Sequence, residues 1–370
     1  MHIALVHDWL TGTTGREKVL ESLSQLFPGA DLFTLVYQPE KVSSVFQKHR
    51  VTTSPLQRLP FGKTRYPHFL PLYWNLMGSF DLSGYDLIVS SSSACAKWVR
   101  NPKKVPHVCY CHTPLREIWD EAGSLETQES FGAPLSARFF RSYLQRCDLK
   151  SNEGVTRFLT NSNGVKERIA RLYGREAEVI PPPLDLDRYT LPKGPGEYFL
   201  VVSDLEPSNR VDLAVKVCGA HGWPLIVVGQ GSDRKRLQAM AGSSVKFQGA
   251  VSEEELPVYY SQAKALIFAG WEDFPMAPLE ALGAGCPVVA FNQVGARETL
   301  EEGVTGVLFN ERKEESLEGA LRRFEKGTFD SEVLRKKAAP FSKKRFFYKA
   351  KLSIRSLMGI QTTLEDEAAS

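Results

Sequence analysis

The chain has 370 residues, a formal net charge of +3, and 42% hydrophobic and 24% charged residues. This length favours two domains, the ordinary composition excludes a disordered chain, and the small charge gives no reason to expect a nucleic-acid partner. The apolar segment at the N-terminus is too short and wrongly flanked for a signal peptide, and no run of 18 apolar residues occurs. We therefore expect a cytoplasmic protein, and the sequence leaves open whether it attaches to a membrane surface.

Short apolar runs alternate with amphipathic segments along the whole chain. Strands are expected at residues 2–7, 30–36, 85–92, 106–111 and 157–162, and then at 197–203, 224–229, 245–249, 263–270, 286–291 and 306–309. Helices are expected at residues 16–27, 164–174, 210–222, 232–242 and 254–263. Such alternation is typical of α/β domains whose parallel sheets are covered on both faces.

A stretch rich in Pro and Gly, residues 179–198, separates the two halves. We therefore predict two Rossmann-like, doubly wound domains, residues 1–184 and 185–340, with a ligand in a cleft between the carboxyl ends of their strands. Residues 341–370 contain a basic amphipathic segment, expected to form a helix that returns to the first domain, followed by a frayed tail.

The segment WEDFPMAPLEALGAGCPVVA carries two acids eight positions apart, Glu272 and Glu280. Glu272 follows an apolar strand, and Glu280 lies inside a helix whose first turn tolerates Pro278, because the missing N–H is harmless there. Loop N–H groups and the positive end of the helix make this place suitable for an anion. The alternative, acids that complement a helix dipole, explains Glu272 tolerably and Glu280 poorly.

Together with other segments, this pattern resembles a known enzyme family. The segments are HDWLTGTTGREKVLESL, YDLIVSSSSACAKWV, YCHTPLREIWD and RETLEEGVTGVLF, within residues 1–350. They resemble the retaining GT-B glycosyltransferases of the GT4-like group 1 family, and among these the lipopolysaccharide and O-antigen mannosyltransferases. The resemblance implies a GT-B fold and transfer of a sugar, by default mannose from GDP-mannose, to a polysaccharide or lipid-linked glycan with retained configuration.

The resemblance also assigns roles to single residues. His112 would contact the transferred sugar, Glu272 would touch the sugar hydroxyls, and Glu280 would accept from the nucleotide ribose, since a carboxylate can accept two hydrogen bonds from a diol. A histidine at a strand end is otherwise often structural. The helix start would add the donor-binding residues Phe274, Met276 and Ala277.

The first loop and the segment after His112 supply further candidates. Gly12 and Gly15 leave the first strand just before a helix, where glycine allows positive φ and close approach to a donor phosphate. A simple helix-start turn is the alternative. Asp8 and Trp9 end that strand and are candidates for the acceptor side, and Arg116 faces the acceptor or caps a turn.

The loop after the first strand of the second half departs from the family. Relatives carry an Arg and a Lys that clamp the diphosphate, and the matching positions here are Asp204 and Asn209. Arg to Asp subtracts two charges and Lys to Asn one, so the site is three charges less positive. One such contact near 4 Å is worth on the order of 4 kcal/mol at an effective dielectric constant near 20. Arg210, the basic residue left in the donor-binding set, tends to pair structurally in relatives.

Smaller departures accompany this loss. Pro275 replaces a glycine and removes an N–H, Ser93 stands where a histidine is common, and Trp98 places a bulky side chain beside the expected cleft. Lys97 or Lys103 are candidates to reach the diphosphate. No cofactor is expected, apart from Mg²⁺ held by Asp204 as a bridge to the diphosphate. The lone C-x-C pair of Cys109 and Cys111 is a weak metal signal, so no other metal site is expected.

Four functions therefore stay open: an active transferase with an altered clamp, a degenerate homologue that serves as partner or scaffold of another glycosyltransferase, a transferase with a polyprenyl-phosphate sugar donor, and a binding module without transferase activity. Residues 56–78 mix basic and aromatic side chains, among them Arg58, Lys63, Arg65 and Trp74. This segment either binds an anionic membrane surface or a lipid-linked acceptor, or packs as a pair of irregular helices.

Overall fold

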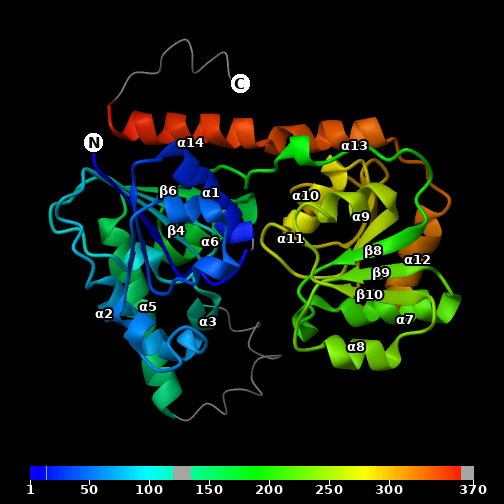
Figure 1. The fold of residues 1–370 in the computed structure, drawn as a ribbon, viewed down its shortest axis with the longest axis horizontal. Helices are drawn as coiled ribbons and strands as arrows, with labels where there is room; N and C mark the ends of the chain where they lie inside the picture. Colours follow the sequence, from blue (N-terminus) through cyan, green and yellow to red (C-terminus); the bar gives the residue numbers. More distant parts are fainter. Residues whose placement is uncertain (14, 120–134, 360–370) are drawn as a thin grey trace. The chain divides into compact units, whose positions relative to one another are not determined.

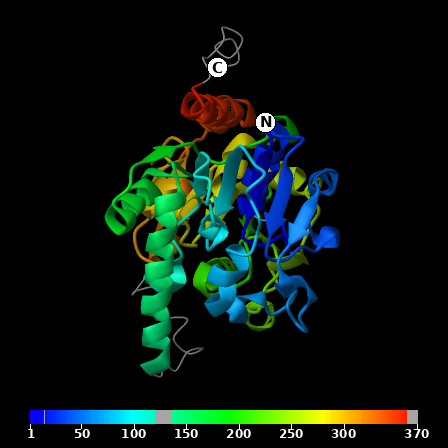
Figure 2. The ribbon, with the colours of Figure 1, turned by 90° about the vertical axis from the view of Figure 1, so that its left-hand side faces the viewer.

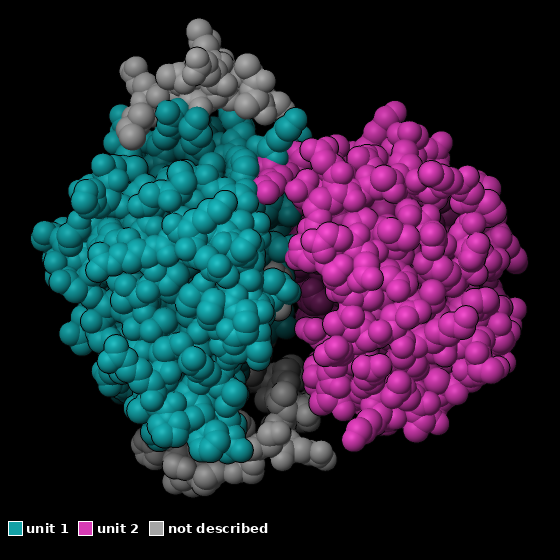
Figure 3. All heavy atoms as spheres, viewed as in Figure 1, with its two compact units in different colours: residues 1–183, 344–370 teal, residues 184–343 magenta. Residues whose placement is uncertain are grey.

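The computed structural model describes residues 1–13, 15–119 and 135–359, which fold into two compact units (Figure 1). One unit comprises residues 1–183 and 344–370, and the other residues 184–343 (Figure 3). The division after Pro183 falls inside the stretch rich in Pro and Gly. The tail that was expected to fray, residues 360–370, lies outside the described residues.

The first unit is built on a seven-stranded parallel sheet with the order β3-β2-β1-β4-β5-β6-β7. The strands are β1 (Ile3–His7), β2 (Asp31–Thr34), β3 (Val51–Thr53), β4 (Leu87–Ser92), β5 (His107–Cys111), β6 (Arg157–Thr160) and β7 (Ala177–Val179). The chain changes direction across the sheet between β1 and β4, where His7 pairs with Ser91. In doubly wound sheets, ligands bind at the carboxyl ends of the strands beside this switch point.

Helices cover both faces of the first sheet (Figure 2). They are α1 (Gly15–Leu26), α2 (Tyr73–Met77), α3 (Arg116–Trp119), α5 (Leu135–Ser151), α6 (Asn163–Tyr173) and α14 (Lys343–Leu357). The last of them, α14, buries Phe346, Ala350 and Ile354 against the face that also carries α1. This spacing of four residues forms one apolar stripe, while Arg345 and Lys351 are exposed.

The second unit is built on a six-stranded parallel sheet with the order β10-β9-β8-β11-β12-β13. Its strands are β8 (Tyr198–Val202), β9 (Leu225–Val228), β10 (Val245–Gly249), β11 (Ala263–Phe268), β12 (Val288–Phe291) and β13 (Gly306–Phe309). Its helices are α7 (Val211–His221), α8 (Arg234–Met240), α9 (Leu256–Gln262), α10 (Met276–Gly283), α11 (Val294–Arg297), α12 (Glu314–Phe324) and α13 (Ser331–Ala338). The switch point here lies between β8 and β11.

The two faces of the second sheet carry separate apolar layers. Helices α7, α8 and α12 pack on one face, and α9, α10 and α13 on the other. Because β8 and β11 are adjacent and parallel, the loops that follow them leave the sheet at the same edge. The loop after β8 carries Asp204 and Asn209, and the segment after β11 carries Glu272 and Glu280. No helix in the described part of the chain is long and apolar enough to cross a membrane.

Candidate active site

His112 directly follows β5 at the carboxyl edge of the first sheet and is only 5% exposed. Its backbone N–H donates to the Ser92 carbonyl at 2.9 Å, and its own carbonyl accepts from the Asn161 amide at 3.0 Å. The Nε2 atom lies 2.8 Å from the Ser91 hydroxyl, and Nδ1 has no hydrogen-bond partner among the described residues. Burial lowers the pKa of His112 well below its ordinary value, so the ring is neutral and can bind a hydroxyl.

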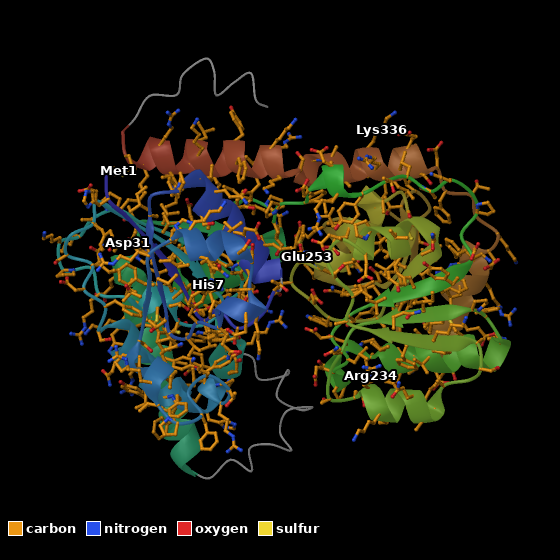
Figure 4. The ribbon with its side chains drawn as sticks, in the orientation of Figure 1. Met1, His7, Asp31, Arg234, Glu253 and Lys336 are labelled. Carbon is orange, nitrogen blue, oxygen red and sulfur yellow. The ribbon has the colours of Figure 1, made fainter. Side chains whose placement is uncertain are left out.

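His7 and Glu17 lie beside His112, and the sequence did not single out either of them. The Nδ1 atom of His7 lies 3.0 Å from the Ser91 carbonyl, and its Nε2 lies 3.7 Å from a Glu17 carboxylate oxygen. Both side chains are buried, and Figure 4 labels His7 within the first unit. The sequence did contain a signal for this pair, because His7 ends a strand and Glu17 lies in the first turn of the helix that follows.

Asp8 is the best-enclosed carboxylate of this edge, with 1% of the residue exposed. It accepts hydrogen bonds from the backbone N–H groups of residues 93, 94, 95 and 96, at 2.6 to 3.0 Å, and one from the Ser93 hydroxyl. Ser93 in turn accepts from Arg16 at 2.8 Å. Asp8 therefore holds the loop after β4, a role that differs from the acceptor-side role expected from the sequence.

Trp9, expected on the acceptor side, is half-buried between other aromatic rings. Its ring centroid lies 5.0 Å from that of Tyr66 and 6.2 Å from that of Tyr73, and the Arg16 guanidinium lies 5.9 Å from it. Residues 56–78 therefore pack partly against the core. Arg116 begins α3 and is half-buried.

The two glycines of the first loop have different surroundings. Gly12 lies in open space, without positive φ, so the predicted backbone requirement is absent there. Gly15 is the first residue of α1, which fits the simpler helix-start interpretation.

Lys97 is not available to a diphosphate, so this expectation is wrong. Its ammonium donates to the Asp148 carboxylate at 2.6 Å and to the Ser151 hydroxyl at 2.6 Å, with 2% of the residue exposed. Trp98 also donates to Asp148, at 2.9 Å, and is 1% exposed. It belongs to the core and does not project into an open site. Lys103 is exposed.

The loop after β8 carries the altered clamp positions of the second unit. Asp204 is exposed, and its carbonyl accepts from the Asn209 amide at 2.9 Å. Arg210 donates to both oxygens of Asp212, at 3.0 and 3.3 Å, so the structural pairing expected for this residue is present.

Contacts with the loop after β9 hold this loop in place. A Cβ at Gly229 would lie 1.9 Å from the Ser203 carbonyl oxygen, so only glycine permits the approach. The Glu206 carboxylate accepts from the backbone N–H of Ser232 at 3.0 Å and from its hydroxyl at 2.5 Å. The backbone that presents Asp204 is therefore anchored on two sides.

Glu272 is half-buried in the loop between β11 and α10. Helix α11 packs directly on it, because a Cβ at Gly295 would lie 2.1 Å from the Glu272 carbonyl oxygen. Pro275 is the N-terminal cap of α10, and Pro278 lies in its first turn. Met276 and Ala277 are half-buried, whereas the Phe274 ring packs 5.8 Å from Phe341, so Phe274 can offer a donor only its backbone.

Glu280 lies inside α10 and is 4% exposed. The Tyr260 hydroxyl donates to one of its carboxylate oxygens at 3.0 Å. Burial, and then the negative charge of Glu280, raise the pKa of Tyr260 well above its usual range, so the phenol stays protonated as a donor. The tyrosine thus fixes the carboxylate orientation, which sequence reasoning did not foresee.

Asp204, the expected magnesium ligand, belongs to no cluster of metal-binding side chains in the described part of the chain. In residues 1–13, 15–119 and 135–359, no three His, Cys, Asp or Glu side chains are grouped as metal ligands. An ion at Asp204 would therefore take its other ligands from substrate oxygens and water. Cys109 and Cys111 are buried core residues, and burial raises the pKa of Cys109 to about 12.

Comparisons with known proteins agree with this arrangement. The family model of group 1 glycosyl transferases matches residues 186–344, and the model of glycosyltransferase family 4 matches residues 14–188. The solved structure of Anabaena HepE in complex with UDP and glucose superposes with a TM-score of 0.72 at 17% identity, covering 96% of this chain and 99% of that one. The expected GT-B fold is thereby confirmed.

Two curated relatives come from Mycobacterium tuberculosis. A GDP-mannose-dependent α-mannosyltransferase is 33% identical over 108 residues, which are 29% of this chain and 28% of that protein. A GDP-mannose-dependent α-(1-6)-phosphatidylinositol monomannoside mannosyltransferase is 28% identical over 192 residues, 43% of this chain and 50% of that protein. The matched segments therefore span half or less of these relatives.

Proposed function

Since the chain belongs to the GT4-like group 1 glycosyltransferase family, we propose that it is a retaining glycosyltransferase that moves a hexose from a nucleotide donor to a glycan acceptor. The main support is the pair formed by Glu272, at the carboxyl edge of the second sheet, and Glu280, oriented by Tyr260. Mannose from GDP-mannose is the first donor to test, because the relatives from Mycobacterium tuberculosis are described as GDP-mannose-dependent. The acceptor would be a polysaccharide or a lipid-linked glycan.

In this proposal His112, Glu272 and Glu280 each contribute binding to the donor. The neutral ring of His112 binds a hydroxyl of the transferred sugar through Nδ1, while Ser91 holds Nε2. Glu272 accepts hydrogen bonds from sugar hydroxyls, and Glu280 accepts from the ribose diol. These contacts speed the reaction only where they are stronger in the transition state than with the bound donor.

The charge of the loop after β8 supports a second candidate. An exposed Asp204, next to an Asn209 that bonds its carbonyl, repels a diphosphate instead of neutralising it. A degenerate homologue that serves as partner or scaffold of another glycosyltransferase would tolerate this change. A transferase that uses a polyprenyl-phosphate sugar would need less positive charge, since its donor carries one phosphate fewer.

Donor hydrolysis by the purified protein separates the nucleotide-sugar transferase from the other two candidates. The wild-type protein, His112→Ala and Glu272→Gln would be incubated with GDP-mannose or UDP-glucose, and release of the nucleoside diphosphate would be followed. We expect slow release by the wild type and at least a tenfold lower rate in either variant. Release at the buffer rate by all three proteins, together with no binding of either donor, would favour the scaffold candidate or the transferase with a polyprenyl-phosphate donor.

We further propose that residues 56–78 bind the anionic inner face of a membrane. Around the aromatic side chains that pack inward, this segment exposes the apolar residues Leu59, Phe61 and Leu72 at 45%, 66% and 47%. The basic residues Arg58, Lys63 and Arg65 are exposed in the same segment. Basic and apolar groups together suit an anionic lipid interface. Co-sedimentation with vesicles that contain phosphatidylglycerol should fall in Phe61→Ser with Lys63→Gln, and unchanged binding would contradict this proposal.

A further inference from the structure

Arg16 is the second residue of α1, the helix that follows β1 at the carboxyl edge of the first sheet. Its side chain is half-buried, and its Nη1 donates to the Ser93 hydroxyl at 2.8 Å. The guanidinium also lies 5.9 Å from the centroid of the Trp9 ring. A hydroxyl and an indole therefore hold this guanidinium in place, and neither of them carries a charge.

The acidic side chains of the same region contact other groups. Glu17, the next residue, lies 3.7 Å from Nε2 of His7. Asp8 accepts from the Ser93 hydroxyl at 2.9 Å and from the backbone N–H groups of residues 93–96. Within the described residues, no ion pair joins Arg16 to a carboxylate. A phosphate at this edge would therefore meet a cation whose contacts in the described chain are neutral.

The position of this cation in the helix argues against a purely structural role. A cation is disfavoured in the first turn of a helix, because the unpaired N–H groups already give that end a partial positive charge. The two charges together attract an anion. Ser93 takes one of the five N–H donors of the guanidinium, and the planar fork that these donors form suits phosphate oxygens.

Arg16 also lies beside the histidine of the candidate active site. Burial, and then the neighbouring His7 and Arg16, lower the pKa of His112 well below its ordinary value. The ring is therefore neutral, and its Nδ1 has no hydrogen-bond partner among the described residues. A sugar phosphate whose sugar is bound by His112 would bring its phosphate close to Arg16.

We propose that Arg16 is a phosphate-binding residue of the first unit, and that it supplies positive charge that Asp204 and Asn209 do not provide. The inference rests on the proposed function, in which His112 binds the transferred sugar. Two substrates of this reaction carry a phosphate, the nucleotide sugar and a lipid-linked acceptor. Both present phosphate oxygens to the same fork of donors, and the experiment distinguishes between them.

Binding to GDP and to farnesyl phosphate would be measured by calorimetry, and binding to guanosine and farnesol, which lack the phosphate, by saturation-transfer NMR. Arg16→Gln removes the charge, Arg16→Lys keeps it, and Lys18→Gln is the matched control, because it removes one positive charge from the same turn of α1. We expect Arg16→Gln to weaken binding of GDP or farnesyl phosphate at least tenfold, which corresponds to about 1.4 kcal/mol. Arg16→Lys should lose less.

Guanosine and farnesol binding, and all binding by Lys18→Gln, should stay within twofold of the wild type, with the fold of each variant checked by thermal unfolding. A loss seen with GDP assigns Arg16 to the donor diphosphate, and a loss seen with farnesyl phosphate assigns it to the acceptor phosphate. Either result supports the inference.

Other outcomes separate the inference from the proposed function. If the wild type binds both phosphates and Arg16→Gln binds them equally well, the inference is wrong, while the proposed function stands. If guanosine or farnesol binding falls together with that of the phosphates, Arg16 only supports the surrounding structure, and the inference is again wrong. If the wild type binds neither GDP nor UDP, the proposed nucleotide donor fails, and the inference survives only where farnesyl phosphate binding depends on Arg16.

Discussion

The hydroxyl of Ser91 lies 2.8 Å from Nε2 of His112, at the carboxyl edge of the first sheet. One residue earlier, the hydroxyl of Ser90 lies 2.8 Å from Nε2 of His107. Because successive side chains of a strand point to opposite faces, these neighbouring serines serve two different histidines. Only His112 lies at the strand end that the proposed function uses.

Ser91→Ala should therefore lower transfer activity by about tenfold, because His112 loses the bond that sets its orientation and tautomer. Its effect on the free energy of unfolding should be similar to that of Ser90→Ala. Ser90→Ala is the control, since it removes an equally buried hydroxyl from the same strand. Donor turnover per folded molecule, with the fold checked by thermal unfolding, is the measurement. Equal turnover by the two variants would show that Ser91 does not position the ring.

The stability of the first unit should fall in mild acid because of His107. Burial lowers the pKa of this imidazole to about 3, against roughly 6.5 in an unfolded chain. Between these values the unfolded chain binds a proton that the folded chain excludes, so stability is lost as the pH falls from about 6.5. One such group contributes up to about 1.4 kcal/mol per pH unit.

His107→Gln should make the decline of the unfolding free energy between pH 6 and pH 4 shallower by about that amount. The unfolding free energy can be taken from hydrogen exchange of the β5 amides at each pH. His68→Gln, at an exposed position, should keep the wild-type slope. An unchanged slope in His107→Gln would mean that this ring is already protonated in the folded protein.

The contact of Lys97 with Asp148 makes a prediction about stability. Lys97→Met leaves the buried carboxylate uncompensated and should lower the unfolding free energy by about 3–5 kcal/mol. Adding Asp148→Asn should recover part of the loss. Lys103→Met, at an exposed site, should change the unfolding free energy by less than about 0.5 kcal/mol. A stable Lys97→Met that loses GDP affinity would return Lys97 to the donor site.

Local patterns in the sequence were sufficient to predict most of the fold. Apolar runs of four to eight residues marked eleven strands that the structure contains. The strands β3 and β7 were missed, because each has only three residues and lies at an edge of the sheet, where the pattern is weak. The position of Pro278 in the first turn of α10 followed from its missing N–H.

The partners of the site residues could not be predicted, because they depend on long-range contacts. Asp8 and the 93–96 loop are more than eighty positions apart in the chain, and the ammonium of Lys97 meets Asp148 about fifty positions away. The sequence identified Lys97 as a cation near the site but not the buried carboxylate that holds it. Arg312 reaches Ser208 across a separation of 104 positions, which no local pattern encodes.

The family clamp can be rebuilt by combining Asp204→Arg with Asn209→Lys. The change adds three positive charges next to the proposed diphosphate site, and it should tighten GDP binding by at least about fivefold after screening. The gain should shrink as salt is raised, since exposed charges are screened over about 10 Å at 0.1 M ionic strength. Calorimetry at two salt concentrations would measure both effects.

Glu332→Arg is the control for charge alone, because it adds two positive charges away from the proposed diphosphate site. Glu332 lies on α13, and its neighbour Ser331 donates to the Gly285 carbonyl just beyond the C-terminal end of α10. This control should leave GDP affinity within twofold of the wild type. Loss of affinity on rebuilding would mean that the loop holds no phosphate, and a donor without a nucleoside diphosphate would then account better for an exposed Asp204.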